Sequence, residues 1–129
     1  MQRNLARSRD DPGETLPKAP PIDHVHLCRY TLGCPELERE VLSLFAGQAP
    51  HTLAQLVAAE SVEPWRSAAH TLKGSARSVG AWRVAEAATY AEALPGCHAS
   101  PQRDTAIACL RHAVAEAIEY IACLTAQAN

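Results

Sequence analysis

The sequence lacks the features that mark membrane-spanning, exported and nucleic-acid-binding proteins. Aromatic residues make up only 5% of the chain, and runs of the β-branched and aromatic residues that favour strands are missing. There is neither a secretory signal nor an apolar run of about 18 residues, so we expect a cytoplasmic protein with no membrane partner. The net charge of −2 provides no overall basic character for nucleic-acid binding, so any positive site must be local.

Cysteines spaced for redox or zinc chemistry are also missing. The chain has five cysteines, an odd number, and no two of them form a CxxC motif. The simple interpretation is that they are reduced thiols in a reducing compartment, where they act as small side chains that fill the core.

The sequence does contain enough apolar surface for one domain. Apolar residues are 47% of the chain and alanine is abundant, which favours helices packed closely through small side chains. Residues 1–21 are polar and dotted with prolines and arginines. We interpret them as a flexible tail that precedes a domain over residues 22–129.

Within this domain, apolar residues recur at helical spacing. The expected helices are a short one at about 23–32, then about 35–57, 62–79, 81–94 and 101–126. Pro50 should kink the second helix or split it in two, whereas Ser61 is a good N-cap and Gly80 a good stop for the third. The pattern predicts an all-α fold, an antiparallel four-helix bundle with a short extra N-terminal helix. One such bundle buries every apolar stripe, so we expect a monomer.

One histidine of the third expected helix lies outside the apolar stripe of that helix. The stripe consists of Trp65, Ala69, Leu72, Ala76 and Val79. His70 lies roughly 140° around the helix from the centre of this stripe, so its side chain should face solvent or a partner. A neutral imidazole in that position presents a nucleophilic nitrogen, although a surface histidine is most often only solvated.

The neighbours of His70 on the same face suggest what the imidazole could react with. Arg66, Lys73 and Arg77 lie one or two turns away and could stabilise the negative charge of a phosphoryl group. Gly74, one turn after His70, costs the helix about 1 kcal/mol relative to alanine, so a function must require the missing side chain. An open approach for a partner protein would explain it. Further candidates for contact with the phosphoryl group or the partner are Ser67 and Ser78.

These residues form a pattern that resembles a known signature. The segment AHTLKGSARSVGA, residues 69–81, is similar to the signature of histidine phosphotransfer (HPt) domains in bacterial two-component phosphorelays, whose core is His-x-x-Lys-Gly. The resemblance implies that Nε2 of His70 accepts a phosphoryl group from a receiver-domain aspartate and passes it to another receiver. It also implies that Lys73 holds phosphoryl oxygens and that Gly74 keeps the approach open.

The same resemblance implies the partners and cofactors. The partners would be receiver domains of response regulators and hybrid sensor kinases, and the chain would need no cofactor of its own because magnesium belongs to the receiver. No nucleotide-binding segment or phosphate loop is present, so the chain should be a phosphocarrier without autokinase activity and not an enzyme. With no acidic group beside His70, phosphatase action is not expected either.

Two other functions remain open at this stage. Asp23, His24, His26 and Cys28 are a dense group of potential metal ligands, although His26 would point away from the helical face shared by His24 and Cys28. Alternatively, the bundle is an adaptor that docks receiver domains without being phosphorylated. Trp82 and Tyr90 fall off the alanine stripe of the fourth helix and would either form a contact patch or pack against neighbouring elements.

Overall fold

The computed structural model describes residues 19–95 and 98–127, and this part of the chain is helical without strands. Its five helices are α1 (His24–Thr31), α2 (Pro35–Ala58), α3 (Val62–Val79), α4 (Trp82–Ala93) and α5 (Pro101–Gln127). Most of the tail expected at residues 1–21 lies outside the described residues, as do Gly96 and Cys97. The expectation that cysteines fill the core is wrong for the four in the described residues, which are exposed: Cys28, Cys34, Cys109 and Cys123.

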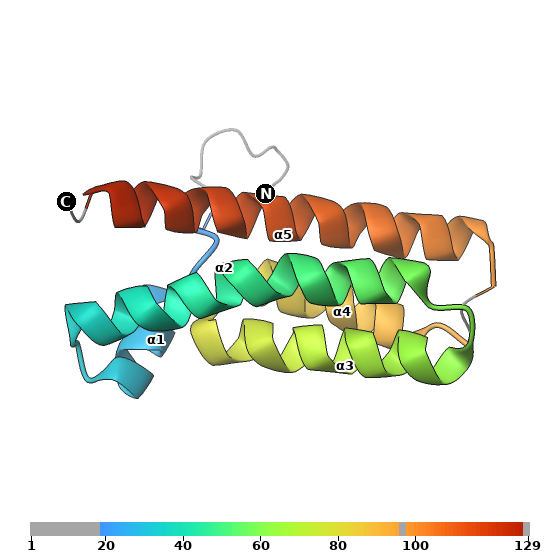
Figure 1. Ribbon diagram of the computed structural model, residues 1–129, viewed down its shortest axis with the longest axis horizontal. Helices are drawn as coiled ribbons and strands as arrows, with labels where there is room; N and C mark the ends of the chain where they lie inside the picture. The colour runs from blue at the N-terminus through green and yellow to red at the C-terminus, as the bar shows by residue number, and fades with distance from the viewer. Residues whose placement is uncertain (1–18, 96–97, 128–129) are drawn as a thin grey trace, which may run out of the picture.

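The four long helices pack side by side as an antiparallel bundle, and α1 lies across one end (Figure 1). Each long helix contacts the next along the chain, and α5 closes the ring by contacting α2. Helix α1 packs against α2 and α3. The expected four-helix bundle with a short extra N-terminal helix is therefore confirmed.

Small side chains bring α3 and α4 close together. Alanines on the facing sides of the two helices are buried, among them Ala69, Ala76, Ala85 and Ala88. Trp65 fills the space near the end of α4, where its indole Nε1 donates a hydrogen bond to the Ala91 carbonyl at 2.8 Å. Because alanines keep the two backbones close, polar side chains at the edge of this contact can reach across from one helix to the other.

Proline 50 neither splits nor ends the second helix. It lies inside α2, which continues from Pro35 to Ala58. A proline inside a helix costs about 3 kcal/mol because it removes one backbone hydrogen bond and crowds the preceding turn. Buried residues on both sides of it, including Ala49 and Leu53, hold the two halves of the helix against the rest of the bundle.

The ends of α1 and α3 meet at Gly80. This glycine ends α3 with a left-handed backbone (φ 76°), and its carbonyl accepts a hydrogen bond from the Asp23 amide at 2.9 Å. A Cβ atom on Gly80 would lie 2.9 Å from Asp23. Asp23 in turn caps α1 by accepting from the His26 amide. Ser61 is at the N-cap of α3 as expected, but its side chain makes no capping hydrogen bond.

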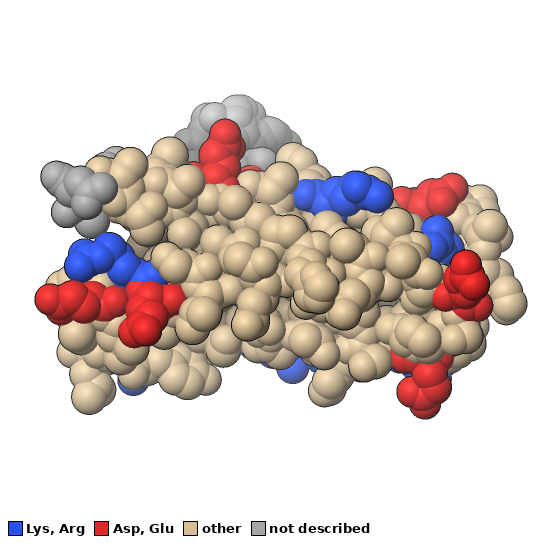
Figure 2. Space-filling view, viewed as in Figure 1, with Lys and Arg blue, Asp and Glu red and all other residues tan. Residues whose placement is uncertain are grey.

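Charge is dispersed over the visible surface. Figure 2 shows acidic and basic side chains next to each other near both ends of this face, with a broad uncharged area in the middle and no continuous basic patch. Among the described residues, no helix is both long enough and apolar enough to cross a membrane.

Candidate functional site

His70 projects from the middle of α3 into solvent. Its side chain is 72% exposed, whereas Ala69 and Leu72 beside it on the helix are buried in the core. The expectation that the imidazole faces away from the bundle interior is confirmed. The apolar stripe of α3 produces this orientation, because burying the stripe forces the opposite face of the helix outward.

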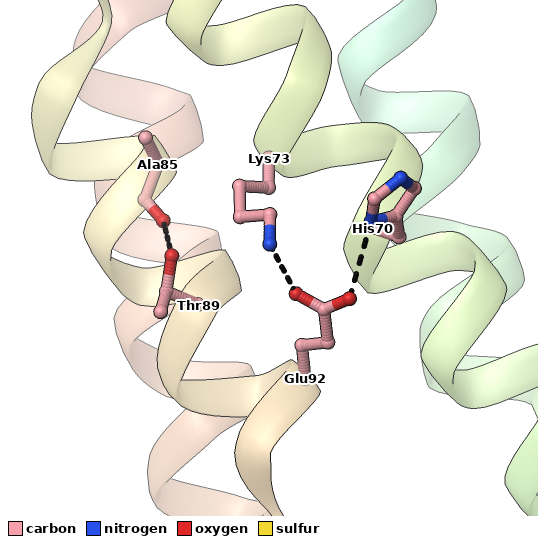
Figure 3. A network of polar contacts seen from close by, with 5 residues as sticks. All are labelled: His70, Lys73, Ala85, Thr89 and Glu92. Carbon is pink, nitrogen blue, oxygen red and sulfur yellow. Dashed lines mark hydrogen bonds and ion pairs between the residues drawn. The ribbon is translucent and has the colours of Figure 1, made fainter.

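A carboxylate from the neighbouring helix holds the imidazole. Glu92, near the end of α4, has one oxygen 3.1 Å from Nδ1 of His70 and the other 2.6 Å from Nζ of Lys73 (Figure 3). The Lys73 side chain is 18% exposed and the Glu92 side chain 28% exposed, so the bridge lies at the edge of the α3–α4 contact. Glu92 therefore links two residues that are three positions apart on α3.

This bridge determines which nitrogen of His70 is available for reaction. The hydrogen bond from Lys73 lowers the pKa of Glu92, partial burial opposes that effect, and the contact with His70 lowers the pKa further. Glu92 is therefore ionised at neutral pH and can only accept hydrogen bonds, so Nδ1 of His70 must carry the proton. In the neutral ring the lone pair is then on Nε2.

One expectation about the site was wrong. An acidic side chain does lie beside His70, so the stated reason for excluding phosphatase action does not hold. The structure also shows that the charge of Lys73 is paired with Glu92. Helical spacing within α3 could not reveal either point, because the carboxylate belongs to a different helix.

A signal for this contact did exist in the sequence. His70 and Glu92 are the same number of residues, eleven, before and after Ala81, which connects α3 to α4. In an antiparallel helical hairpin, residues equally distant from the turn lie at the same level along the two helices. Pairing the two helices about Gly80 and Ala81 would therefore have placed the carboxylate beside the imidazole.

The remaining candidates on α3 do not all converge on His70. Arg66 and Arg77 are exposed, and within the described residues neither side chain takes part in a hydrogen bond or ion pair. Ser67 lines a hollow between α2 and α3. The Ser78 hydroxyl donates to the Ser75 carbonyl at 2.7 Å. Since Ser78 is about 12 Å along the helix axis from His70, it is not part of the imidazole's surroundings.

Gly74 is exposed and has open space in front of it. Apart from the helix backbone around it, no atom of the described residues lies within 4 Å of a Cβ atom built on Gly74, so their packing does not require a glycine. Gly47 in α2 is equally open, so openness alone does not identify a functional glycine. What distinguishes Gly74 is its position one helical turn from His70, on the same outer face.

The potential metal ligands of the N-terminal segment are engaged in packing contacts. The Asp23 carboxylate accepts hydrogen bonds from the His26 amide at 3.1 Å and from Trp82 Nε1 at 2.9 Å. His24 Nε2 lies 2.6 Å from the Tyr120 hydroxyl. Across the described part of the chain, no group of three or more histidine, cysteine or acidic side chains is placed to hold a metal ion.

The two aromatic residues of α4 are both partly open to solvent. Trp82 is 41% exposed and Tyr90 is 42% exposed. Trp82 also packs on the His26 ring, with the ring centroids 4.8 Å apart. Trp82 therefore packs against a neighbouring element and also lies partly at the surface. Each of the two alternatives considered for it holds in part.

Comparison with known proteins identifies one similarity. The family model described as Hpt domain matches residues 40–120 of the chain, which is more than half of its length. The matched segment includes His70, Lys73, Gly74 and Glu92. No curated protein and no solved structure matches the chain.

Proposed function

The chain belongs to the Hpt domain family, and from this membership we propose that it carries a phosphoryl group on Nε2 of His70. Hpt domains are phosphocarriers that interact with receiver domains in phosphorelays. The proposed donor is an aspartyl phosphate on one receiver, and the acceptor is an aspartate on another. The single observation that carries the assignment to His70 is its exposed imidazole, with Nδ1 occupied by Glu92.

The transfer step is a displacement at phosphorus. The Nε2 lone pair attacks the phosphorus of the aspartyl phosphate, and an N–P bond forms as the P–O bond to the aspartate breaks. The aspartate leaves as a carboxylate, taking the electron pair of the broken bond. The reverse reaction with a second receiver returns Nε2 to its starting state, so the chain carries the group without net change.

Glu92 has a clear role in this step. When Nε2 gains a phosphoryl group while Nδ1 keeps its proton, the ring acquires positive charge. The Glu92 carboxylate, 3.1 Å from Nδ1, stabilises that charge and also prevents the ring from turning. Glu92 is therefore a positioning residue, because it acts through the imidazole and does not contact the phosphoryl group.

Other parts of the site supply positive charge. Lys73 donates to Glu92 through one of its three N–H groups and has two left for phosphoryl oxygens. Arg66 and Arg77, which have no ion-pair partner among the described residues, add positive potential on the same face. Magnesium would belong to the receiver, and the chain is proposed to act in the cytoplasm without a cofactor or autokinase activity of its own.

Transfer from a labelled receiver tests the proposal. Receiver domains phosphorylated with [³²P]acetyl phosphate and magnesium are mixed with the wild-type chain, with His70→Gln and with His112→Gln. His112 is also an exposed histidine in a helix, α5, and serves as the matched control. We expect acid-labile, alkali-stable label on the wild type and on His112→Gln, and none on His70→Gln.

Two outcomes would contradict the proposal. Label that persists on His70→Gln would mean that another residue is the acceptor. Binding of a phosphorylated receiver with no label on the wild type would instead favour the adaptor function. The acid and alkali tests separate phosphohistidine from the phosphate esters of serine and threonine.

A further inference from the structure

The outer side of the contact between α2 and α5 is hollowed and largely apolar. A hollow of about 550 Å³ lies between the two helices, and Arg111 is the one charged residue that lines it. Figure 2 shows the broad uncharged area of this view over the middle of α2. Exposed residues of the lining are small on both helices: Pro50, Ala54 and Ala58 on α2, and Ala115 on α5.

An exposed stripe of α5 adjoins this hollow. Ala108, Ala115 and Ala122 are exposed and lie seven residues apart, so they fall on one side of the helix. Arg111 and Glu119 lie on the same side, four residues before and four residues after Ala115. Both are exposed, and within the described residues neither side chain makes an ion pair. We call the hollow together with this stripe the α2–α5 face.

The charges of the stripe are complementary to themselves. Since Arg111 and Glu119 are equally far from Ala115, two α5 helices that run antiparallel and meet at Ala115 place Arg111 of each copy opposite Glu119 of the other. A parallel pairing would instead set arginine against arginine and glutamate against glutamate. Opposite charges across an interface fix its register, whereas like charges in contact oppose association. The charge pattern therefore selects the antiparallel pairing.

The small side chains of the stripe permit the same pairing. With Ala115 at the centre, Ala108 of each copy meets Ala122 of the other. Facing alanines let two helices approach to about 8 Å, the close end of the usual range. Asp104, the remaining charged residue of the stripe, falls opposite Ala126, so no like charges meet.

We propose that the α2–α5 face binds a second copy of this chain, with α5 packed antiparallel on α5 about a two-fold axis at Ala115. The overlap from Asp104 to Ala126 is about 33 Å long, and α5 with the adjoining edge of α2 is about 20 Å wide, so each copy would bury about 650 Å². This area is within the range of about 600–1,000 Å² per partner for specific interfaces. The expected monomer followed from the burial of every apolar stripe, whereas this face consists mainly of small exposed side chains outside those stripes.

A second copy on this face would leave both phosphorylation sites open. In the described part of the chain α5 contacts α2 and α4 but not α3, and His70 projects outward from α3. The dimer therefore neither covers the imidazole nor needs it, and the inference does not depend on the phosphocarrier function.

Charge exchange tests the proposed pairing. Sedimentation equilibrium of the full chain measures its mass between about 5 and 500 µM, where an interface of this size should form. We expect the wild type to reach twice the 13.9 kDa of one chain. Arg111→Glu and Glu119→Arg each replace two attractive contacts with two repulsive ones, so each should raise the Kd of the dimer about tenfold or more. The double variant restores both attractions with reversed polarity and should dimerise like the wild type.

Mixing and matched controls make the test specific. Arg111→Glu and Glu119→Arg, each weak alone, should form a heterodimer when mixed, because every facing pair is then of opposite charge. Arg29→Glu on α1 and Glu86→Arg on α4 change exposed charges outside the face and should leave the Kd unchanged. Circular dichroism monitors folding, and either single variant decides the test if the other unfolds. Labelling of His70 by potassium phosphoramidate, which needs no receiver, should be the same in all these variants.

Three results would overturn the inference. The first is a wild type that stays monomeric over the whole concentration range. The second is a dimer that Arg111→Glu and Glu119→Arg leave unchanged, or that the two controls weaken equally, because the contact would then use another surface or depend only on net charge. The third is a double variant that remains monomeric, which would contradict the antiparallel pairing. Failure of His70 labelling would count against the phosphocarrier function alone.

Discussion

Substitutions at Gly74 distinguish an effect on the stability of the bundle from an effect on phosphoryl transfer from its partner. The proposed change is Gly74→Ala, followed by Gly74→Leu, with Gly47→Ala as the matched control. Both glycines lie inside helices, and at both a new Cβ atom would have no atom of the described residues within 4 Å beyond the adjoining helix backbone. The two sites therefore offer the same stability gain and differ only in their distance from His70.

The magnitude of the stability change follows from this openness. Alanine is favoured over glycine in a helix interior by about 1 kcal/mol, and no steric term opposes the gain at either site. Gly74→Ala and Gly47→Ala should each raise the free energy of unfolding by about 0.5–1 kcal/mol, which raises Tm by roughly 2–6 °C for a domain of this size. Urea or thermal denaturation followed by circular dichroism measures this shift.

The rate of phosphoryl transfer should fall after substitution at Gly74 but not at Gly47. The Gly74→Leu side chain would stand one turn from Nε2 in the space that a receiver must occupy. We expect its rate of phosphorylation by a receiver to fall about tenfold or more, equivalent to about 1.4 kcal/mol in the transition state. Gly47→Ala should transfer at the wild-type rate, and phosphoramidate should label every variant normally.

Two results would refute this reasoning. If Gly74→Leu accepts the phosphoryl group from a receiver at the wild-type rate, the glycine does not provide clearance for the partner. If Gly74→Ala destabilises the bundle while Gly47→Ala stabilises it, then Gly74 serves the fold in a way that its open surroundings do not explain. A protein more stable than wild type but slower in transfer supports the clearance argument directly.

Four further predictions concern His70, Glu92 and Gly80. His70→Gln should change the free energy of unfolding by no more than about 0.5 kcal/mol, because the side chain is exposed, and substantial unfolding in urea titration would show a structural role. Glu92→Ala should let the neutral His70 ring divide its proton between both nitrogens, visible in ¹⁵N NMR, and should slow phosphoramidate labelling; an unchanged tautomer would contradict the assigned bridge. Because the pKa of Glu92 is lowered from 4.5, its ion pair with Lys73 stabilises the fold above about pH 4.5, and this contribution is lost as pH falls through the lower pKa of the folded state. In Glu92→Gln, the free energy of unfolding should therefore change less with pH in this acidic range than it does in the wild type. The same dependence in the variant and the wild type would show that the ion pair contributes nothing. Gly80→Ala should destabilise the protein by about 2 kcal/mol, because φ is 76° and the new Cβ would lie 2.9 Å from Asp23; wild-type stability would mean that α1 shifts without cost.

Much of the fold could be predicted because each helix carries its own signals. The bounds of α3, α4 and α5 fall within a residue or two of those expected from apolar spacing, proline and glycine. The consequence of Pro50 could not be predicted, because a sequence shows the cost of a broken hydrogen bond but not the packing that offsets it. The capping of α1 by Asp23 is local and was open to prediction, because aspartate is a preferred N-cap residue and accepts from the His26 amide three residues on. The contacts of Asp23 with Gly80 and Trp82 could not be predicted, since they come from distant parts of the chain.

The same distinction between local and long-range contacts applies to the candidate site. The sequence by itself determined that His70 faces outward with Gly74 one turn away, because a single amphipathic helix decides which of its faces is buried. Pairing α3 and α4 about Gly80 and Ala81 puts Glu92 at the level of His70, but only the tertiary structure decided that Glu92 holds Nδ1 and that it also pairs with Lys73. The physical reason is that these contacts join α3 to α4, and their geometry depends on how closely two helices pack and in what register.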